Sequence, residues 1–304
     1  MSDVANPSID LPPAVTLVEG AGGLPMLRVD TDNASAEISL QGAQALSWAP
    51  TGHEPVLWTS PRSRFERSVA IRGGIPPSFP WFAAGREPEM RPSHGFARLA
   101  EFTLVGAEEE SDGAMTLTLR LTDTDVTGLP GTDVWPHPFE LTATITVGPT
   151  LYVAFTVTNS GDRVRSYEDA LHAYVAVADV RDVRIAGLEG VPYLSKIGDP
   201  GPYSQHGELT LTGKTDRVYG TSSAATVVDP GLDRRVHVGK NGSASTVVWN
   251  PWSAAAAEMP DLGEEHWTTM VCVEAANVLH DGVVLSPGES HTTTVYFAVE
   301  HGTG

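Results

Sequence analysis

The sequence predicts an all-β fold, a sandwich or barrel of antiparallel sheets with few short helices. Apolar and polar residues alternate with period two along several segments, and clusters of Gly, Pro, Asn, Asp and Ser separate those segments. In addition, no long segment carries the apolar period of an amphipathic helix. Together these patterns favour strands over helices for most of the chain.

The alternation is clearest in four segments, each expected to be a half-buried strand, which span residues 115–122, 141–147, 151–158 and 292–299. Turn residues separate them, and the acidic stretch 107–113 is expected to be a hairpin loop. Residues 253–259 are rich in alanine, but the prolines on either side limit a helix there to about two turns.

At 304 residues the chain can bury a large core. Neither a break in composition nor an internal repeat marks a boundary, so we expect one domain over residues 14–304 after an N-terminal tail of residues 1–13. The only cysteine, Cys272, excludes a disulfide within the chain. Residues 1–13 lack the basic and apolar regions of a signal peptide, and no apolar run reaches the ~20 residues of a membrane span. These features predict a cytoplasmic protein.

Acidic residues outnumber basic ones, with 38 Asp and Glu against 19 Lys and Arg and a net charge of −19. This balance argues against binding to nucleic acids and to anionic membranes, because both depend on basic patches. We therefore expect a small-molecule partner. No segment indicates a subunit interface, so a monomer is expected.

Two short segments collect cations in spite of this charge. Arg72 precedes two glycines, and about twenty residues later His94, Gly95 and Arg98 follow one another closely. Guanidinium groups match phosphate or carboxylate with two parallel hydrogen bonds, and glycines let the backbone approach a ligand. The segments therefore suggest a pocket for a small phosphorylated substrate. The alternatives are a surface salt bridge for Arg72 and an exposed loop position for His94.

His172 and Glu274 stand out within apolar strands. In the expected strand 171–177, His172 shares a face with Tyr174 and Ala176, and it either does chemistry or is hydrogen-bonded in the core. Glu274 lies in the apolar segment 270–276, where a carboxylate needs a function or an ion pair. Burial would raise the pKa of Glu274, which suits a general base.

The remaining candidates carry weaker signals. Asp216 either hydrogen-bonds sugar hydroxyls or pairs with Arg217 or another neighbour. The aromatic segment 79–82 either stacks on a sugar or, by default, fills the core. No closely spaced histidine pair supports a metal triad, and no phosphate-binding glycine motif lies between a strand and a helix, so neither a metal nor a cofactor is predicted.

Taken together, these segments resemble the aldose 1-epimerase superfamily, and most closely its hexose-6-phosphate mutarotase branch, the glucose-6-phosphate 1-epimerase-like proteins. The order and spacing of the matching stretches make the match specific. They are Gln41–Gln44 with Trp48, Leu57-Trp58, Ile71–Pro76, Phe79–Phe82, His94–Arg98, Trp135–Phe139, Leu171–Tyr174, Thr215–Tyr219, Val248–Trp252 and Val271–Glu274.

The resemblance implies a galactose-mutarotase-like β-supersandwich and assigns roles to residues. It makes His172 the catalytic acid and Glu274 the catalytic base. Substrate-binding positions go to five further residues: the arginines Arg72 and Arg98 in the phosphate-recognition segments, His94 near the sugar ring, Asp216, and Ser93. Some members carry glutamine where this chain has Ser93, so the shorter side chain would lose a sugar contact and could alter hexose preference.

The activity implied is the interconversion of the α and β anomers of a hexose 6-phosphate, glucose 6-phosphate being the leading candidate. Glu274 takes the proton of the C1 hydroxyl, and a protonated His172 donates to the ring oxygen. Two alternatives remain open at this stage, a mutarotase for unphosphorylated aldoses and a non-catalytic sugar-binding module.

Overall fold

The computed structural model describes residues 9–302. Within this range 23 strands accompany one α-helix and four short 3-10 helices, which confirms the all-β prediction. No helix in this part of the chain is long and apolar enough to cross a membrane. Strand β1 begins at Val15. The predicted tail lies partly outside the described residues, and its boundary with the domain stays a prediction.

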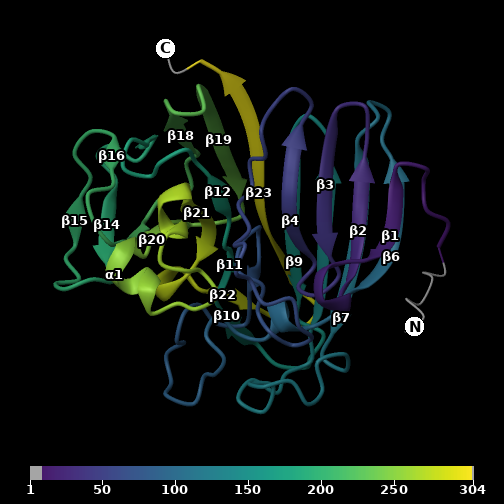
Figure 1. Ribbon diagram of the computed structural model, residues 1–304. Helices are drawn as coiled ribbons and strands as arrows, with labels where there is room; N and C mark the ends of the chain where they lie inside the picture. The colour runs from purple at the N-terminus through teal and green to yellow at the C-terminus, as the bar shows by residue number, and fades with distance from the viewer. Residues whose placement is uncertain (1–8, 303–304) are drawn as a thin grey trace.

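The back layer of the molecule is a nine-stranded antiparallel sheet, shown behind the other sheets in Figure 1. Its long strand β23 crosses the molecule diagonally and pairs with β19 on one side and β9 on the other. In spatial order the strands are β16 (Leu209–Thr210), β13 (Arg184–Ala186), β18 (Ala225–Asp229), β19 (Arg234–Asn241), β23 (Ser290–His301), β9 (Leu151–Thr158), β8 (Glu140–Val147), β7 (Met115–Thr122) and β6 (Thr103–Glu109).

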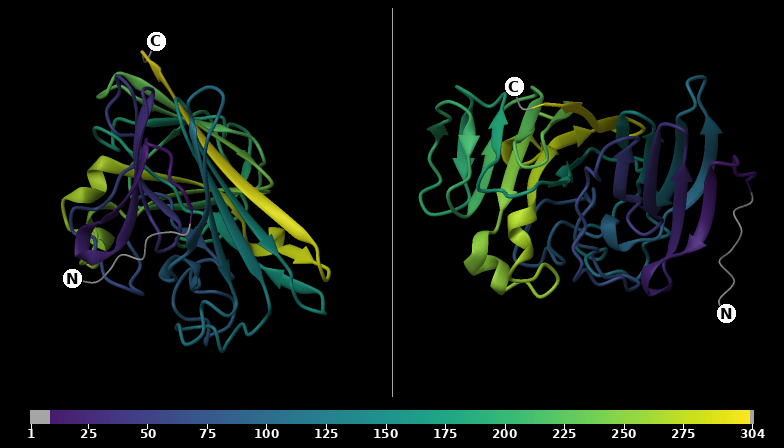
Figure 2. Two further views of the ribbon diagram at one scale, coloured as in Figure 1. Left: turned by 90° about the vertical axis from the view of Figure 1, so that its right-hand side faces the viewer. Right: turned by 45° about the horizontal axis from the view of Figure 1, so that its top comes forward.

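Two further sheets pack against this layer, and the splayed arrangement is visible in Figure 2. One has four strands in sequence order, namely β1 (Val15–Glu19), β2 (Pro25–Asp30), β3 (Ala34–Ser39) and β4 (Gln44–Pro50). The other has eight: β15 (Tyr203–Ser204), β14 (Pro192–Ser195), β17 (Thr215–Tyr219), β20 (Ser245–Asn250), β21 (Met270–Asn277), β11 (Asp169–Leu171), β5 (Pro77–Ser78), and β12 (Tyr174–Ala176) beside β21.

Short elements complete the described chain. Helix α1 (Trp252–Ala257) confirms the brief alanine-rich helix expected between two prolines. A two-stranded ribbon and four 3-10 helices connect the sheets: β10 (Arg165–Tyr167), β22 (Val283–Leu285), η1 (Ala21–Gly23), η2 (Ala97–Leu99), η3 (His266–Thr269) and η4 (Leu279–Asp281).

The four alternating segments fold as predicted, as β7, β8, β9 and β23. The expectation of a hairpin loop over 107–113 is wrong in part, because β6 continues to Glu109. Strand β6 lies at the edge of the nine-stranded sheet, where acidic side chains can point into water and oppose pairing with another chain. An acidic composition therefore does not exclude a strand at this position.

The expected strand 171–177 is interrupted in a way that matters for the site. Strands β11 and β12 both pair with β21, with Leu171 opposite Ala275 and Tyr174 opposite Cys272. The register is the same on both sides of the gap, which places His172 across from Glu274. Both side chains therefore belong to one cross-strand pair.

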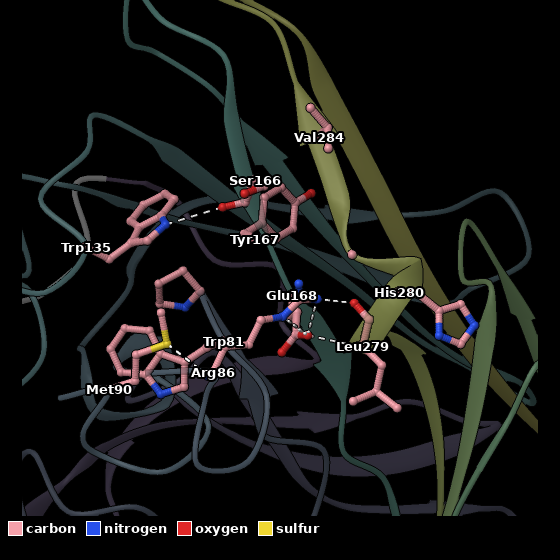
Figure 3. Close-up of a pocket in the computed structure, with 12 residues that line it drawn as sticks. Trp81, Arg86, Met90, Trp135, Ser166, Tyr167, Glu168, Leu279, His280 and Val284 are labelled. Carbon is pink, nitrogen blue, oxygen red and sulfur yellow. Dashed lines mark hydrogen bonds and ion pairs between the residues drawn. The ribbon is translucent and has the colours of Figure 1, made fainter. Parts of the chain in front are cut away.

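Glu168, between β10 and β11, binds two other segments close to this pair, the loop after β5 and the turn after β21, and Figure 3 shows its contacts with Arg86 and Leu279. Its buried carboxylate accepts hydrogen bonds from the Phe82 backbone N–H at 3.2 Å and the Leu279 N–H at 2.9 Å. It also pairs with the Arg86 guanidinium at 2.8 Å. The loop after β5 and the turn after β21 are thus fastened to one carboxylate.

Replacing Glu168 by Ala should lower the free energy of unfolding by about 2–4 kcal/mol, because two buried N–H groups lose their acceptor. Arg86→Ala should cost less than about 1 kcal/mol, since 61% of that side chain is exposed. Urea unfolding of both variants checks this, and equal losses would mean that the surface ion pair, not the backbone contacts, carries the stabilisation.

Candidate active site

A cavity of about 250 Å³ opens on one face of the eight-stranded sheet, and it contains every site residue predicted from the sequence. They come from five separate parts of the fold, and none of them lies elsewhere. These residues are Arg72, Ser93, His94, Arg98, His172, Asp216 and Glu274.

The floor of the cavity follows from strand pairing. Asp216 on β17 lies opposite Trp249 on β20, and Val247 on β20 lies opposite Glu274 on β21. Directly paired residues share a face of the sheet, and so do residues two apart on one strand, so these four side chains line the same surface. Arg217 takes the other face, where its guanidinium bonds Gln205 Oε1 at 3.0 Å. The suggested Asp216–Arg217 pair is therefore wrong.

His172 and Glu274 meet in this cavity with little contact to water. The distance from His172 Nε2 to Glu274 Oε1 is 3.5 Å, and the residues are 6% and 1% exposed. His172 Nδ1 and both carboxylate oxygens of Glu274 have no hydrogen-bond partner among the described residues. Buried polar atoms are nearly always paired, so three unpaired atoms at one place indicate a site prepared for a ligand.

The environment sets the ionisation of this pair. Burial, followed by the charges of Arg98 and Arg72, lowers the pKa of His172 to about 3. Burial, followed by the nearby Asp216, raises the pKa of Glu274 well above its ordinary value. The expected raised pKa of Glu274 is confirmed, but the expectation of a protonated His172 is wrong. With a pKa of about 3 its imidazole is neutral at pH 7.

The two arginines differ in the partners that the protein provides for their guanidinium groups. The Arg72 guanidinium bonds the Tyr174 hydroxyl at 3.1 Å and Asp261 at 2.9 Å, and the two groups raise its pKa. Arg98 has no carboxylate partner among residues 9–302, and its buried Nε has no acceptor. Burial lowers the pKa of Arg98 to about 10. A desolvated, uncompensated guanidinium in a cavity is the stronger anion site of the two.

His94 and Ser93 reach the site from the loop after β5. His94 Nδ1 lies 3.0 Å from Ser78 Oγ and accepts the Ala83 backbone N–H at 3.4 Å. A backbone N–H can only donate, so Nδ1 is unprotonated and the ring of the neutral His94 carries its proton on Nε2. The Ser93 carbonyl oxygen accepts a hydrogen bond from Arg98 Nη2. Ser93 thus orients an arginine through its backbone.

Two further interpretations of the sequence concern the glycines after Arg72 and the aromatic segment 79–82. Gly73 and Gly74 serve close packing, because a Cβ atom would lie 2.3 Å from Thr59 Cα at the first and 2.1 Å from the Ala45 carbonyl oxygen at the second. Both have positive φ angles, of 123° and 60°. The two glycines shape the segment that carries Arg72, but they do not line the cavity.

In the aromatic segment 79–82, the default of core filling holds for all four residues, and the ring of Phe82 also lines the cavity.

Several residues of the site were missed by sequence reasoning. Tyr174 had a signal, since alternation placed it beside His172, and their rings stack at 4.9 Å. Lys196, Met259 and Asp261 had none, because they lie in loops without periodicity. Lys196 Nζ lies 4.6 Å from the centroid of the Phe82 ring, at the rim of the cavity.

A second cavity of about 300 Å³ lies on the other side of the loop after β5, around the Glu168 contacts (Figure 3). Its walls include Trp81, Trp135 and Met90. It contains neither His172 nor Glu274, so the paired acid and base belong to the first cavity alone.

The chain resembles known proteins over most of its length. A protein from Escherichia coli (strain K12) is 36% identical over 255 residues, which cover 83% of both chains, and its name assigns it to the glucose-6-phosphate 1-epimerases. A similarly named protein from Salmonella typhimurium (strain LT2) is 36% identical over 257 residues, covering 83% of this chain and 82% of the relative.

A crystal structure titled as that of a mutarotase, YeaD, from Salmonella typhimurium matches this fold with a TM-score of 0.87. The two share 30% sequence identity, and the match covers 96% of this chain and 95% of that one. Residues 25–298 match the family model described as aldose 1-epimerase. With the cavity and its acid–base pair, these similarities place the chain in the aldose 1-epimerase family, as an enzyme of the galactose-mutarotase-like fold.

Proposed function

We propose that this enzyme interconverts the α and β anomers of a hexose 6-phosphate, with glucose 6-phosphate as its substrate. The observation that carries the proposal is the pair of His172 and Glu274, which face each other at 3.5 Å with three unpaired polar atoms. Mutarotation needs an acid and a base on two neighbouring oxygens of one sugar. A closely spaced imidazole and carboxyl group can serve both oxygens.

In this mechanism Glu274 removes the proton of the C1 hydroxyl while the imidazolium of His172 protonates the ring oxygen. The C1–O5 bond breaks and the open-chain aldehyde forms. Rotation about C1–C2 presents the other face of the aldehyde. His172 then takes back the proton of the C5 hydroxyl, Glu274 returns its proton to the carbonyl oxygen, and the ring closes as the other anomer. Protons and electrons balance without a cofactor.

The substrate itself supplies the charge that this mechanism needs. After burial, the charges of Arg98 and Arg72 are the next causes of the low pKa of His172. A phosphate dianion on these guanidinium groups offsets their charges and so favours a proton on His172. The proton can then move from the Glu274 carboxyl group to His172 Nε2, which lies 3.5 Å from Glu274 Oε1. Phosphate recognition and activation of the acid are therefore linked.

Two alternatives are less well supported. A mutarotase for free aldoses has no use for a guanidinium such as that of Arg98, which lines the cavity with a buried Nε and without a carboxylate partner among the described residues. A non-catalytic sugar-binding protein has no use for an unpaired His172 and Glu274, because unsatisfied buried groups reduce stability. The relatives named for glucose-6-phosphate 1-epimerase also favour the phosphorylated substrate.

We also propose that the enzyme works in the cytoplasm as a monomer on a free sugar phosphate, without nucleic acid or membrane partners. The net charge of −19 supports the lack of polyanionic partners. The single cysteine, Cys272, is buried and unpaired, which suits a reducing compartment.

The acid–base assignment predicts that Glu274→Gln and His172→Asn each lower the enzymatic rate of anomer exchange by about 10²–10⁴-fold. Exchange NMR on glucose 6-phosphate measures it. His237→Asn is a matched control, because His237 is a half-buried strand histidine on β19 that bonds Thr226 outside the cavity. Unchanged exchange in the first two variants would refute the assignment.

The phosphate assignment predicts that Arg98→Met raises KM for glucose 6-phosphate by about 10–100-fold, because the phosphate loses one charged hydrogen-bonding partner. KM for glucose should change by less than about twofold, because glucose has no phosphate for the guanidinium to bind. Steady-state kinetics with both sugars separates the effects, and equal weakening of the two would assign Arg98 a structural role.

The desolvated carboxyl group also predicts a pH-dependent stability. Burial holds the folded-state pKa of Glu274 above the ordinary 4.5, so folding binds its proton, and this stabilisation is lost as pH rises through the raised pKa. Glu274→Gln should therefore unfold at a higher temperature than the wild type, by a margin that widens above pH 4.5. Calorimetry from pH 4.5 to 8 tests this, with Glu109→Gln on the exposed edge strand as control. A constant margin would contradict it.

A further inference from the structure

Lys196 occupies an unusual place for a cation in this chain. The protein has only three lysines among its 304 residues, and one of them reaches the rim of the catalytic cavity from the exposed loop between β14 and β15. Its backbone N–H donates to the Asp216 carbonyl oxygen at 2.8 Å, which fixes the base of the side chain next to a cavity residue. The loop position is therefore tied to the site.

The ammonium group of Lys196 has no protein partner that satisfies it. Among residues 9–302 no carboxylate lies within salt-bridge distance and no acceptor receives its hydrogen bonds. At close range Nζ lies 4.6 Å from the centroid of the Phe82 ring, and at longer range its charge acts on Asp216 and Glu274, against the burial that raises the pKa of both. Such a contact is weak at an exposed site. In a chain with twice as many acidic as basic residues, a cation kept free at this position remains available to an anion.

Three cationic side chains thus line one cavity of about 250 Å³, and they differ in how many protein partners they have. Arg72 bonds Asp261 and Tyr174, whereas the half-buried Arg98 has no carboxylate partner among residues 9–302, and its Nε is buried without an acceptor. Lys196 is exposed, on a flexible stem, on a different element from both arginines. A phosphate dianion has three acceptor oxygens, which one guanidinium with a planar fork does not saturate.

We propose that Lys196 is a substrate-binding residue that leaves Phe82 to contact the phosphate of the substrate and so selects phosphorylated over free sugars. This inference rests on the proposed function. The ammonium group serves as a point charge at the rim, while Arg98 binds the same phosphate from inside the cavity. Because Lys196 touches a remote group of the substrate and not the hemiacetal, it should act on KM more than on kcat.

The test compares Lys196→Met, which keeps the length of the stem, with Lys196→Arg, which keeps the charge. Lys196→Met should raise KM for glucose 6-phosphate by about 10-fold and change KM for glucose by less than about twofold. Lys196→Arg should restore most of the affinity. Lys214→Met is the matched control, an exposed lysine beside β17 that does not line the cavity, and it should behave as the wild type.

Equal effects of Lys196→Met on both sugars, no effect on either, or the same loss in Lys214→Met would overturn the role of Lys196 while leaving the proposed function in place. A wild-type enzyme that does not accelerate anomer exchange of glucose 6-phosphate would overturn the proposed function, and this inference with it.

Discussion

The site depends on one constraint, the pairing of β11 and β12 with β21 in a single continuous register. This pairing brings an imidazole and a carboxyl group together from distant parts of the chain and buries both, and among residues 9–302 neither His172 Nδ1 nor the Glu274 oxygens have a hydrogen-bond partner. These unpaired polar atoms lower stability and are available to the two oxygens of a hemiacetal.

A second constraint comes from charge. An acidic chain collects Arg72, Arg98 and Lys196 around one cavity, where burial raises the pKa of Glu274 and Asp216 and so reduces the negative charge of both carboxyl groups. Of these three cations only Arg72 has a carboxylate within salt-bridge distance among residues 9–302, so the cavity retains positive charge. That charge lowers the pKa of His172 until an anion offsets it. One set of cations can therefore determine both which sugar binds and when the acid carries its proton.

The sequence was informative where local pattern decides the structure. Period-two alternation identified β7, β8, β9 and β23, and an apolar context singled out Glu274. Alternation along β11 and β21 does not reveal that the two strands pair, and resemblance to a family was needed to join His172 with Glu274. The low pKa of His172 and the contact of Lys196 with Phe82 depend on packing between distant segments, which no local pattern encodes.

A crystal structure of the Glu274→Gln variant with glucose 6-phosphate would show how the sugar lies relative to the acid–base pair and the cations. We expect the phosphate within hydrogen-bonding distance of Arg98, the ring oxygen beside His172, and the C1 hydroxyl beside position 274. A sugar bound in the reverse orientation, with its phosphate against His172, would refute these assignments. So would a sugar phosphate seated only in the second cavity, beside Glu168.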